Sequence, residues 1–295
     1  MALDAFKNLP GGAPGVPALS GGASNALQRL ANSAGGGAVA RTGTSVDERA
    51  MQKIQDGTAH ELMKRAWGEV ELVFFLDESG SIIAQDMENI ASGKPGVIAG
   101  TTEFVNSVLR KEKSKGANTL VTIVQFDEGS RIIHNRVPIN QMPTFKFDPS
   151  GGGETHLYNR LAEQIRRFKD MRAAERHPTE NVLFAISTDG QDNSGSSPDR
   201  VKGLIADRKQ AGWNFLFFGD ASLDISIATT IGIEHAVSYS TQGKLGVAAN
   251  GAAVNNVIEG LRDSGKIPAN WAQPVINNRI SDPARHIGGA GSTAR

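Results

Sequence analysis

The sequence predicts a doubly wound, Rossmann-like α/β domain over residues 70–265, with a mainly parallel sheet, one antiparallel edge strand and helices on both faces. Short apolar runs alternate with longer amphipathic stretches, which indicates strands that alternate with helices. Several runs are continuously apolar, as is typical of strands buried on both faces of a sheet. One pair of runs is joined by a short polar turn, which predicts a hairpin and therefore an antiparallel strand.

The first half of the domain contains three predicted strands and one helix. Residues 71–77 form an apolar run that predicts a buried strand. Residues 97–114 have the apolar spacing of an amphipathic helix, and residues 119–126 predict the second strand. The turn at 127–130 leads directly into residues 131–137, so we expect the third strand to run antiparallel to the second.

The second half continues the alternation. We expect a helix over 156–175, a fourth strand over 181–188 and a further helix that begins at Ser197 and Pro198. The remaining predicted elements are a fifth strand at 214–218, a short helix at 222–231, a sixth strand at 235–239 and a closing helix near 250–263.

Three segments flank the domain. Residues 1–43 contain nine Gly and three Pro, and we expect them to be a disordered tail because they cannot bury enough apolar surface to offset their ordering entropy. Residues 44–69 predict a helical extension that opens with a capping box. Residues 266–295 are again rich in Pro, Asn and Gly, and we expect a loosely ordered C-terminal tail.

Composition restricts the classes of function. The formal net charge is +0, so nucleic acid and anionic membranes are not favoured as partners. There is no cysteine, which excludes disulfides, thiol nucleophiles and Cys-ligated zinc. No signal peptide or membrane-length apolar run is recognisable, so we expect a soluble, cytoplasmic protein.

Five oxygen-bearing side chains follow the ends of predicted strands or precede a predicted helix. Asp77, Ser79 and Ser81 follow the first strand, Thr155 precedes the helix near 156, and Asp189 follows the fourth strand. In a doubly wound sheet, binding sites form at the carboxyl ends of strands, beside the switch in strand order. We therefore expect these side chains to converge on one edge of the sheet.

Two carboxylates and three hydroxyls are hard oxygen donors. Such a set suits Mg²⁺, or Mn²⁺ or Ca²⁺, better than a soft metal or one that prefers imidazole. The sequence therefore predicts a divalent-cation site.

The pattern resembles the metal-ion-dependent adhesion site of the von Willebrand factor A (VWA) family. The residues that carry the resemblance are Asp77-x-Ser79-x-Ser81, the distant Thr155, and Thr188-Asp189-Gly190. Flanking segments are similar to stand-alone bacterial members, and the match runs over residues 70–240. The resemblance implies that Ser79, Ser81 and Thr155 contact the cation directly, whereas Asp77 and Asp189 act mostly through water.

The resemblance further implies a protein-interaction module rather than an enzyme. A protein partner would supply an Asp or Glu to the cation, and bacterial members suggest an ATPase or another assembly component as that partner. The alternatives are a Mg²⁺-dependent phosphoryl-transfer enzyme or hydrolase, and a structural or virion component. The sequence contains no Gly-x-Ser-x-Gly elbow, phosphate-binding loop or His-Glu-x-x-His motif.

Several acidic residues accompany the predicted site. We expect Glu78, Glu154 and Asp192 to be solvated at its rim. Residues 83–96 form an insertion relative to the family pattern. Within it, Asp86 or Glu88 could occupy the open position on the cation.

Overall fold

The computed structural model describes residues 70–174, 181–220, 225–240 and 246–280. The tail expected at 1–43 and the helical extension expected at 44–69 lie outside the described residues, as does the end of the chain from 281.

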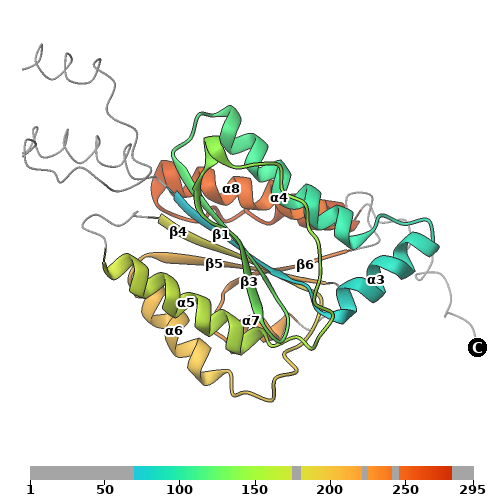
Figure 1. Ribbon diagram of the computed structural model, residues 1–295. Coiled ribbons are helices and arrows are strands. Elements are labelled where there is room, and N and C mark those ends of the chain that lie inside the picture. Colours follow the sequence, from blue (N-terminus) through green and yellow to red (C-terminus); the bar gives the residue numbers. More distant parts are fainter. Residues whose placement is uncertain (1–69, 175–180, 221–224, 241–245, 281–295) are drawn as a thin grey trace, which may run out of the picture. The chain divides into compact units, whose positions relative to one another are not determined.

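The centre of the domain is a six-stranded sheet with the strand order β3-β2-β1-β4-β5-β6 (Figure 1). Four neighbouring pairs are parallel, and the edge strand β3 is antiparallel to β2. This confirms the predicted fold class. The strands are β1 (Val70–Asp77), β2 (Thr119–Phe126), β3 (Ser130–Pro138), β4 (Asn181–Thr188), β5 (Trp213–Asp220) and β6 (His235–Tyr239).

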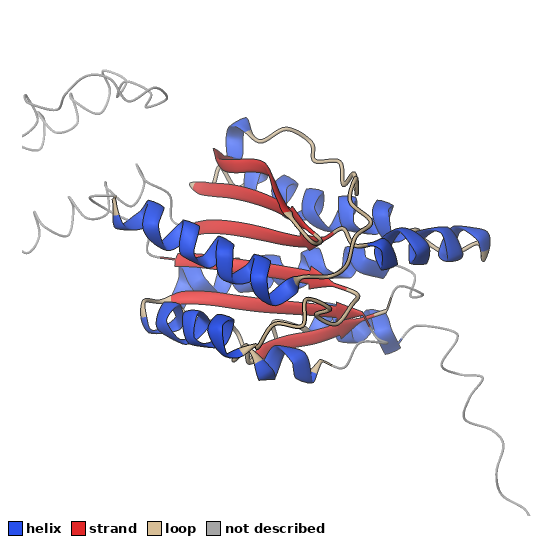
Figure 2. Cartoon of the chain, turned by 60° about the horizontal axis from the view of Figure 1, so that its bottom comes forward, coloured by secondary structure: helices blue, strands red, loops and turns tan. Residues whose placement is uncertain are grey.

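Helices cover both faces of the sheet (Figure 2). Helices α4, α8 and α9 pack on one face, and α5, α6 and α7 pack on the other. The helices are α3 (Gly80–Ala91), α4 (Val97–Ser114), α5 (Leu157–Ala173), α6 (Asp199–Gln210), α7 (Ser226–Thr230), α8 (Ala249–Ser264) and α9 (Gln273–Ile280), with short 3-10 turns at Ile139–Gln141 and Gly246–Ala248.

The two faces of β1 show why its sequence is continuously apolar. Leu72, Phe74 and Leu76 belong to the core under α4 and α8, whereas Val73 and Phe75 belong to the core under α5 and α6. Successive side chains of a strand point to opposite faces, so a strand covered on both faces needs apolar residues at every position.

The packed region extends further toward the C-terminus than the sequence indicated. A loosely ordered tail was expected from residue 266, but Trp271 and Val275 are buried in the core, and α9 packs against α8 and β6. The Trp271 ring packs edge-on against Phe218 of β5. Burial of this large aromatic side chain stabilises a segment whose composition alone resembles a linker.

Among the described residues, no helix is long and apolar enough to cross a membrane.

The strand order reverses between β1 and β4, because the chain runs outward to β2 and β3 on one side and to β5 and β6 on the other. Both strands are parallel, so their carboxyl ends lie at the same edge. This topological switch point is where the loops on the two sides separate and leave room for a site.

Candidate functional site

The structure places the five predicted residues at the switch point. Asp77 is the last residue of β1, Ser79 is the N-cap of α3, and Ser81 lies in the first turn of that helix. Asp189 directly follows β4, and Thr155 lies two residues before α5.

Hydrogen bonds join four of these residues. The Asp77 carboxylate accepts hydrogen bonds from the Ser79 backbone N–H, at 2.9 Å, and from the Thr188 hydroxyl. The Ser79 and Ser81 hydroxyl oxygens are 3.0 Å apart, and the Ser81 hydroxyl donates to Asp189 Oδ1 at 2.9 Å. The Asp-x-Ser-x-Ser loop is therefore connected directly to the end of β4.

Thr155 is brought to the same place by close packing around Gly190. A Cβ atom at Gly190 would lie 3.1 Å from Thr155 Oγ1 and 3.9 Å from Ser81 Oγ. A glycine thus lets two hydroxyls from different loops approach one point. The main chain supports this arrangement, because the Asn193 N–H donates to the Thr155 carbonyl at 2.8 Å.

The start of α3 is fixed against the glycine-rich loop that precedes Thr155. The Gly80 N–H donates to the Gly153 carbonyl at 3.0 Å, and a Cβ atom at Gly80 would lie 2.9 Å from the Gly152 carbonyl oxygen. Only glycine permits so close an approach at this position without displacing the backbone.

Both carboxyl groups have raised pKa values. Burial raises the pKa of Asp77, and the hydrogen bonds from Ser79 and Thr188 oppose this only in part. Burial, followed by the charge of Asp77, raises the pKa of Asp189 to about 7. The site therefore concentrates negative charge in a poorly solvated place, a situation that a bound cation relieves.

The donor set distinguishes among metals. In the described part of the chain, no three His, Cys, Asp or Glu side chains gather into a metal-binding cluster. The five predicted residues supply two carboxylates and the hydroxyls of Ser79, Ser81 and Thr155. Such oxygens suit a hard cation such as Mg²⁺, whereas Zn²⁺ sites are built from imidazole, thiolate and carboxylate ligands.

The prediction of a solvated acidic rim was wrong for Glu78. Its carboxylate is buried, forms an ion pair with Arg131 and accepts a hydrogen bond from Gln125. Asp192 is half-buried and caps α5, since its Oδ1 accepts the Tyr158 N–H at 2.8 Å. Of the three, only Glu154 has a largely exposed side chain.

Residues 83–96 form most of α3 and its connection to α4, and Asp86 lies on the side of α3 that contacts the start of α4. Asp86 is buried, and its Oδ1 accepts the Ile98 N–H in the first turn of α4 at 2.8 Å. The Oδ1 atom of Asp86 thus serves as a cap for the start of α4. Glu88 is exposed on the surface of α3.

Two further polar residues near the site were not predicted. Asp220 ends β5, Tyr239 ends β6, and both are buried. The pKa of Tyr239 is raised well above its usual value, first by burial and then by the charges of Asp189 and Asp220. Their positions at carboxyl ends of strands were the available signal, but an isolated Asp or Tyr after an apolar run has no motif to mark it.

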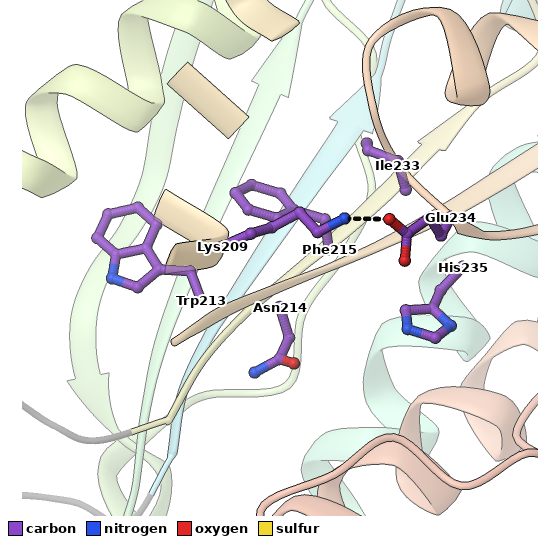
Figure 3. A pocket seen from close by; sticks show the side chains of 7 residues that line it. All are labelled: Lys209, Trp213, Asn214, Phe215, Ile233, Glu234 and His235. Atoms are coloured by element: carbon purple, nitrogen blue, oxygen red, sulfur yellow. Dashed lines mark hydrogen bonds and ion pairs between the residues drawn. The ribbon is translucent and has the colours of Figure 1, made fainter. Parts of the chain in front are cut away.

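The cavity drawn in Figure 3 is separate from this site. It has a volume of about 160 Å³, and the residues that line it include Trp213 and His235, the first residues of β5 and β6. Trp213 pairs with Val182 near the start of β4, whereas Asp189 follows the end of that strand. At about 3.3 Å per residue, the two places are roughly 20 Å apart along the sheet.

No known protein family matches this chain, and no curated protein matches it in sequence. Solved structures that resemble this chain include the following three. Proximal thread matrix protein 1 from the mussel byssus has a TM-score of 0.47 and 16% identity over 65% of this chain. The PilB minor pilin from Streptococcus sanguinis has a TM-score of 0.48 and 12% identity over 68% of this chain. The ArnB paralog VWA2 from Sulfolobus acidocaldarius has a TM-score of 0.39 and 13% identity over 59% of this chain.

The match covers 48%, 64% and 41% of those chains, respectively, which is less than two thirds of each. Because every identity is below 25% and every TM-score is below 0.5, we take no functional property from these neighbours. The likeness to VWA domains rests on the strand order of this chain and on the positions of its own motif residues.

Proposed function

We propose that this protein is a divalent-cation-dependent protein-interaction module, in which the cation at the carboxyl edge of the sheet takes an acidic side chain of a partner protein as a ligand. The observation that carries the proposal is the convergence of Asp77, Ser79, Ser81, Thr155 and Asp189 at the switch point.

The charge of the site supports a carboxylate as the incoming ligand. Ser79, Ser81 and Thr155 would supply neutral oxygens, and Asp77 is already engaged by two donors. An octahedral Mg²⁺ or Mn²⁺ has six ligands, so such a set leaves at least one position for an exchangeable ligand. A cation with mostly neutral ligands keeps enough charge to favour a carboxylate over a neutral group.

The surroundings of Asp77 argue against the alternative of a phosphoryl-transfer enzyme. An aspartate nucleophile needs an oxygen that can reach its substrate. Asp77 is only 2% exposed, and its two oxygens accept hydrogen bonds from Ser79 and Thr188, respectively. This geometry suits a residue that organises a site better than one that attacks a substrate.

The test is a capture experiment with the full chain as bait and chelation as the variable. A partner that binds in Mg²⁺ should be released by EDTA and should fail to bind the Asp189→Ala variant. The matched control is Asp263→Ala, which removes an exposed carboxylate from the last turn of α8.

Once a partner is captured, its acidic residues can be replaced one at a time. One replacement should reproduce the effect of EDTA. If capture is indifferent to both chelation and Asp189→Ala, then the proposed function is wrong.

A further inference from the structure

Glu78 is a buried carboxylate that connects several elements near the candidate site. It directly follows β1, is 2% exposed, and donates its main-chain N–H to the Phe126 carbonyl at 2.8 Å. Its Oε1 accepts the Arg131 Nε–H at 3.0 Å. Its Oε2 accepts hydrogen bonds from Arg131 at 2.5 Å, from the Gln125 amide at 3.2 Å and from the Ser150 main-chain N–H at 3.3 Å. The carboxylate therefore joins the end of β1 to β2, to β3 and to the loop before α5.

Two of these donors also hold the main chain just before Ser150. Gln125 and Arg131 each donate to the Asp148 carbonyl at 3.1 Å. The preceding residue, Phe147, is fixed by its burial in the core under α4. The chain is thus held in place as far as Ser150, where the carboxylate described above accepts the main-chain N–H.

The three residues that follow, 151–153, are glycines and have no side chain to hold the loop. Gly152 has a φ of +103°, a conformation that residues with a side chain rarely adopt. Ordering glycine costs more conformational entropy than ordering any other residue. At the far end of the run, the Gly153 carbonyl accepts the Gly80 N–H at 3.0 Å. The position of Thr155 therefore depends on how the two ends of this glycine run are held.

Asp77 and Glu78 serve opposite sides of the candidate site. The Asp77 carboxylate accepts the Thr188 hydroxyl of β4, whereas the Glu78 carboxylate accepts the Gln125 amide of β2. Adjacent side chains of an extended chain point to opposite sides, so two neighbouring carboxylates can reach two different loops. The first organises the Asp-x-Ser-x-Ser loop beside β4, and the second holds the entrance to the glycine run.

We propose that Glu78 is a positioning residue of the cation site, which fixes the glycine run and thereby the Thr155 hydroxyl. This inference rests on the proposed function. Glu78 acts through Thr155 rather than as a ligand. The charge of Arg131 balances that of Glu78, so the pair orders the loop without adding net charge to the site. Buried ion pairs can serve such a specific geometry rather than stability.

The test uses a charge-balanced variant of the full chain, Glu78→Gln with Arg131→Gln. Removing both partners leaves no unpaired buried charge, so the chain should stay folded. In calorimetric titration of the metal-stripped protein, Mg²⁺ affinity should fall about tenfold, as is usual when a residue that orients a metal ligand is replaced. Because the net charge is unchanged, this loss reports the position of the ligand rather than attraction for the cation.

A second variant, Glu78→Asp, keeps the charge but shortens the side chain by one methylene group. It should weaken Mg²⁺ binding in the same direction, because the shorter carboxylate cannot reach Arg131 and Ser150 together. It carries the test if the charge-balanced variant does not fold. If neither variant folds, Glu78 serves the fold itself and the inference is wrong.

The matched control is an ion pair of the same kind at the other edge of the sheet. Glu112 is 1% exposed, pairs with Arg262 and accepts the Thr119 hydroxyl at 2.8 Å. Thr119 begins β2, so this pair lies at the amino edge of the sheet. Glu112→Gln with Arg262→Gln should lower the thermal midpoint about as much as the charge-balanced variant does, but it should leave Mg²⁺ affinity unchanged.

A double-mutant cycle shows whether Glu78 acts through Thr155. In a Thr155→Ala background, the charge-balanced change should weaken Mg²⁺ binding by less than about twofold, because the hydroxyl that the pair positions is already lost. In a Ser81→Ala background, the same change should still weaken binding about tenfold, since Ser81 belongs to the other loop of the site.

Each contrary result has a separate meaning. If the charge-balanced variant binds Mg²⁺ like the wild type, or if the control pair lowers the affinity equally, then the inference is wrong while the proposed function stands. The same conclusion follows if the loss is as large in the Thr155→Ala background as in the wild type. If the wild type binds no Mg²⁺, the proposed function fails, and the inference fails with it.

Discussion

The two ends of β1 each bury a carboxylate, but they treat its charge in opposite ways. Near the amino end, Glu71 is fully buried and forms ion pairs with Arg136 and Arg172. At the carboxyl end, Asp77 is almost as deeply buried, yet its hydrogen-bond donors are a hydroxyl and a backbone N–H. The first carboxylate is neutralised by basic side chains of the fold, whereas the hydrogen-bond donors to the second are neutral groups.

This difference separates a carboxylate paired with basic side chains from one that accepts hydrogen bonds from neutral donors. A buried charge that has basic partners fixes neighbouring elements, and here Glu71 connects β1 to β3 and α5. A buried charge with neutral donors makes the folded chain less stable than it could be, which is common where a ligand completes the site.

The largest expected effect on stability comes from removing the paired carboxylate near the amino end of β1. Glu71→Ala leaves two arginine side chains without their buried partner, so it should lower the free energy of unfolding by about 3–5 kcal/mol. Urea denaturation of the full chain measures this change. Asp263→Ala, which removes an exposed carboxylate, should change the value by less than about 0.5 kcal/mol. A loss below about 1 kcal/mol for Glu71→Ala would show that the ion pairs do not hold these elements together.

Much of this architecture is readable in the sequence, because it follows from continuous apolar runs. The predicted strands at 119–126, 181–188 and 235–239 and the helix at 97–114 have the bounds that the structure shows. The five site residues also converge as expected, since parallel strands bring their carboxyl ends to one edge. These features depend on local pattern and on topology, and neither requires knowledge of a specific side-chain contact.

The sequence was less informative where distant residues pair. Arg131 is 53 positions from Glu78, so nothing local indicates that Glu78 is buried and paired rather than solvated. Trp271 lies in a segment that contains Pro and Asn residues, and its contact with Phe218 depends on the position of β5 in the sheet. Asp86 looked available as a cation ligand because its role as a cap for α4 depends on how two helices meet.

The next prediction tests the functional end of β1. Asp77→Asn removes a charge that burial disfavours and keeps an acceptor oxygen, so the free energy of unfolding should change by less than about 1 kcal/mol. Affinity for Mg²⁺ should nevertheless fall about 10- to 100-fold, as is usual when a residue that orients metal ligands is replaced. Calorimetric titration of the metal-stripped protein measures the affinity. Unchanged Mg²⁺ affinity in Asp77→Asn would contradict the proposed difference between the carboxylates at the two ends of β1.

The smallest expected effect concerns pH and sharpens the same contrast. In the metal-stripped protein, burial and the charge of Asp77 raise the pKa of Asp189 from its usual 3.8 to about 7. Well below pH 3.8 the carboxyl group is protonated in both the folded and the unfolded chain. As the pH rises, the unfolded chain ionises first, so folding becomes less favourable until the folded group ionises near pH 7.

The wild type should therefore lose stability between pH 4 and pH 7 relative to Asp189→Asn, which cannot ionise at this position. One pKa unit corresponds to 1.36 kcal/mol, and with allowance for the partial solvation of Asp189 we expect a difference of about 1–2 kcal/mol. Urea midpoints of both proteins at pH 5 and pH 8, without metal, measure the difference and cancel the titration of groups that do not interact with Asp189. Saturating Mg²⁺ at pH 8 should restore stability to the wild type, because a bound cation compensates the ionised carboxylates. Identical pH dependence of the two proteins would mean that the charge of Asp189 is neutralised within the fold, as that of Glu71 is. The carboxyl edge of the sheet would then carry no uncompensated charge at this residue.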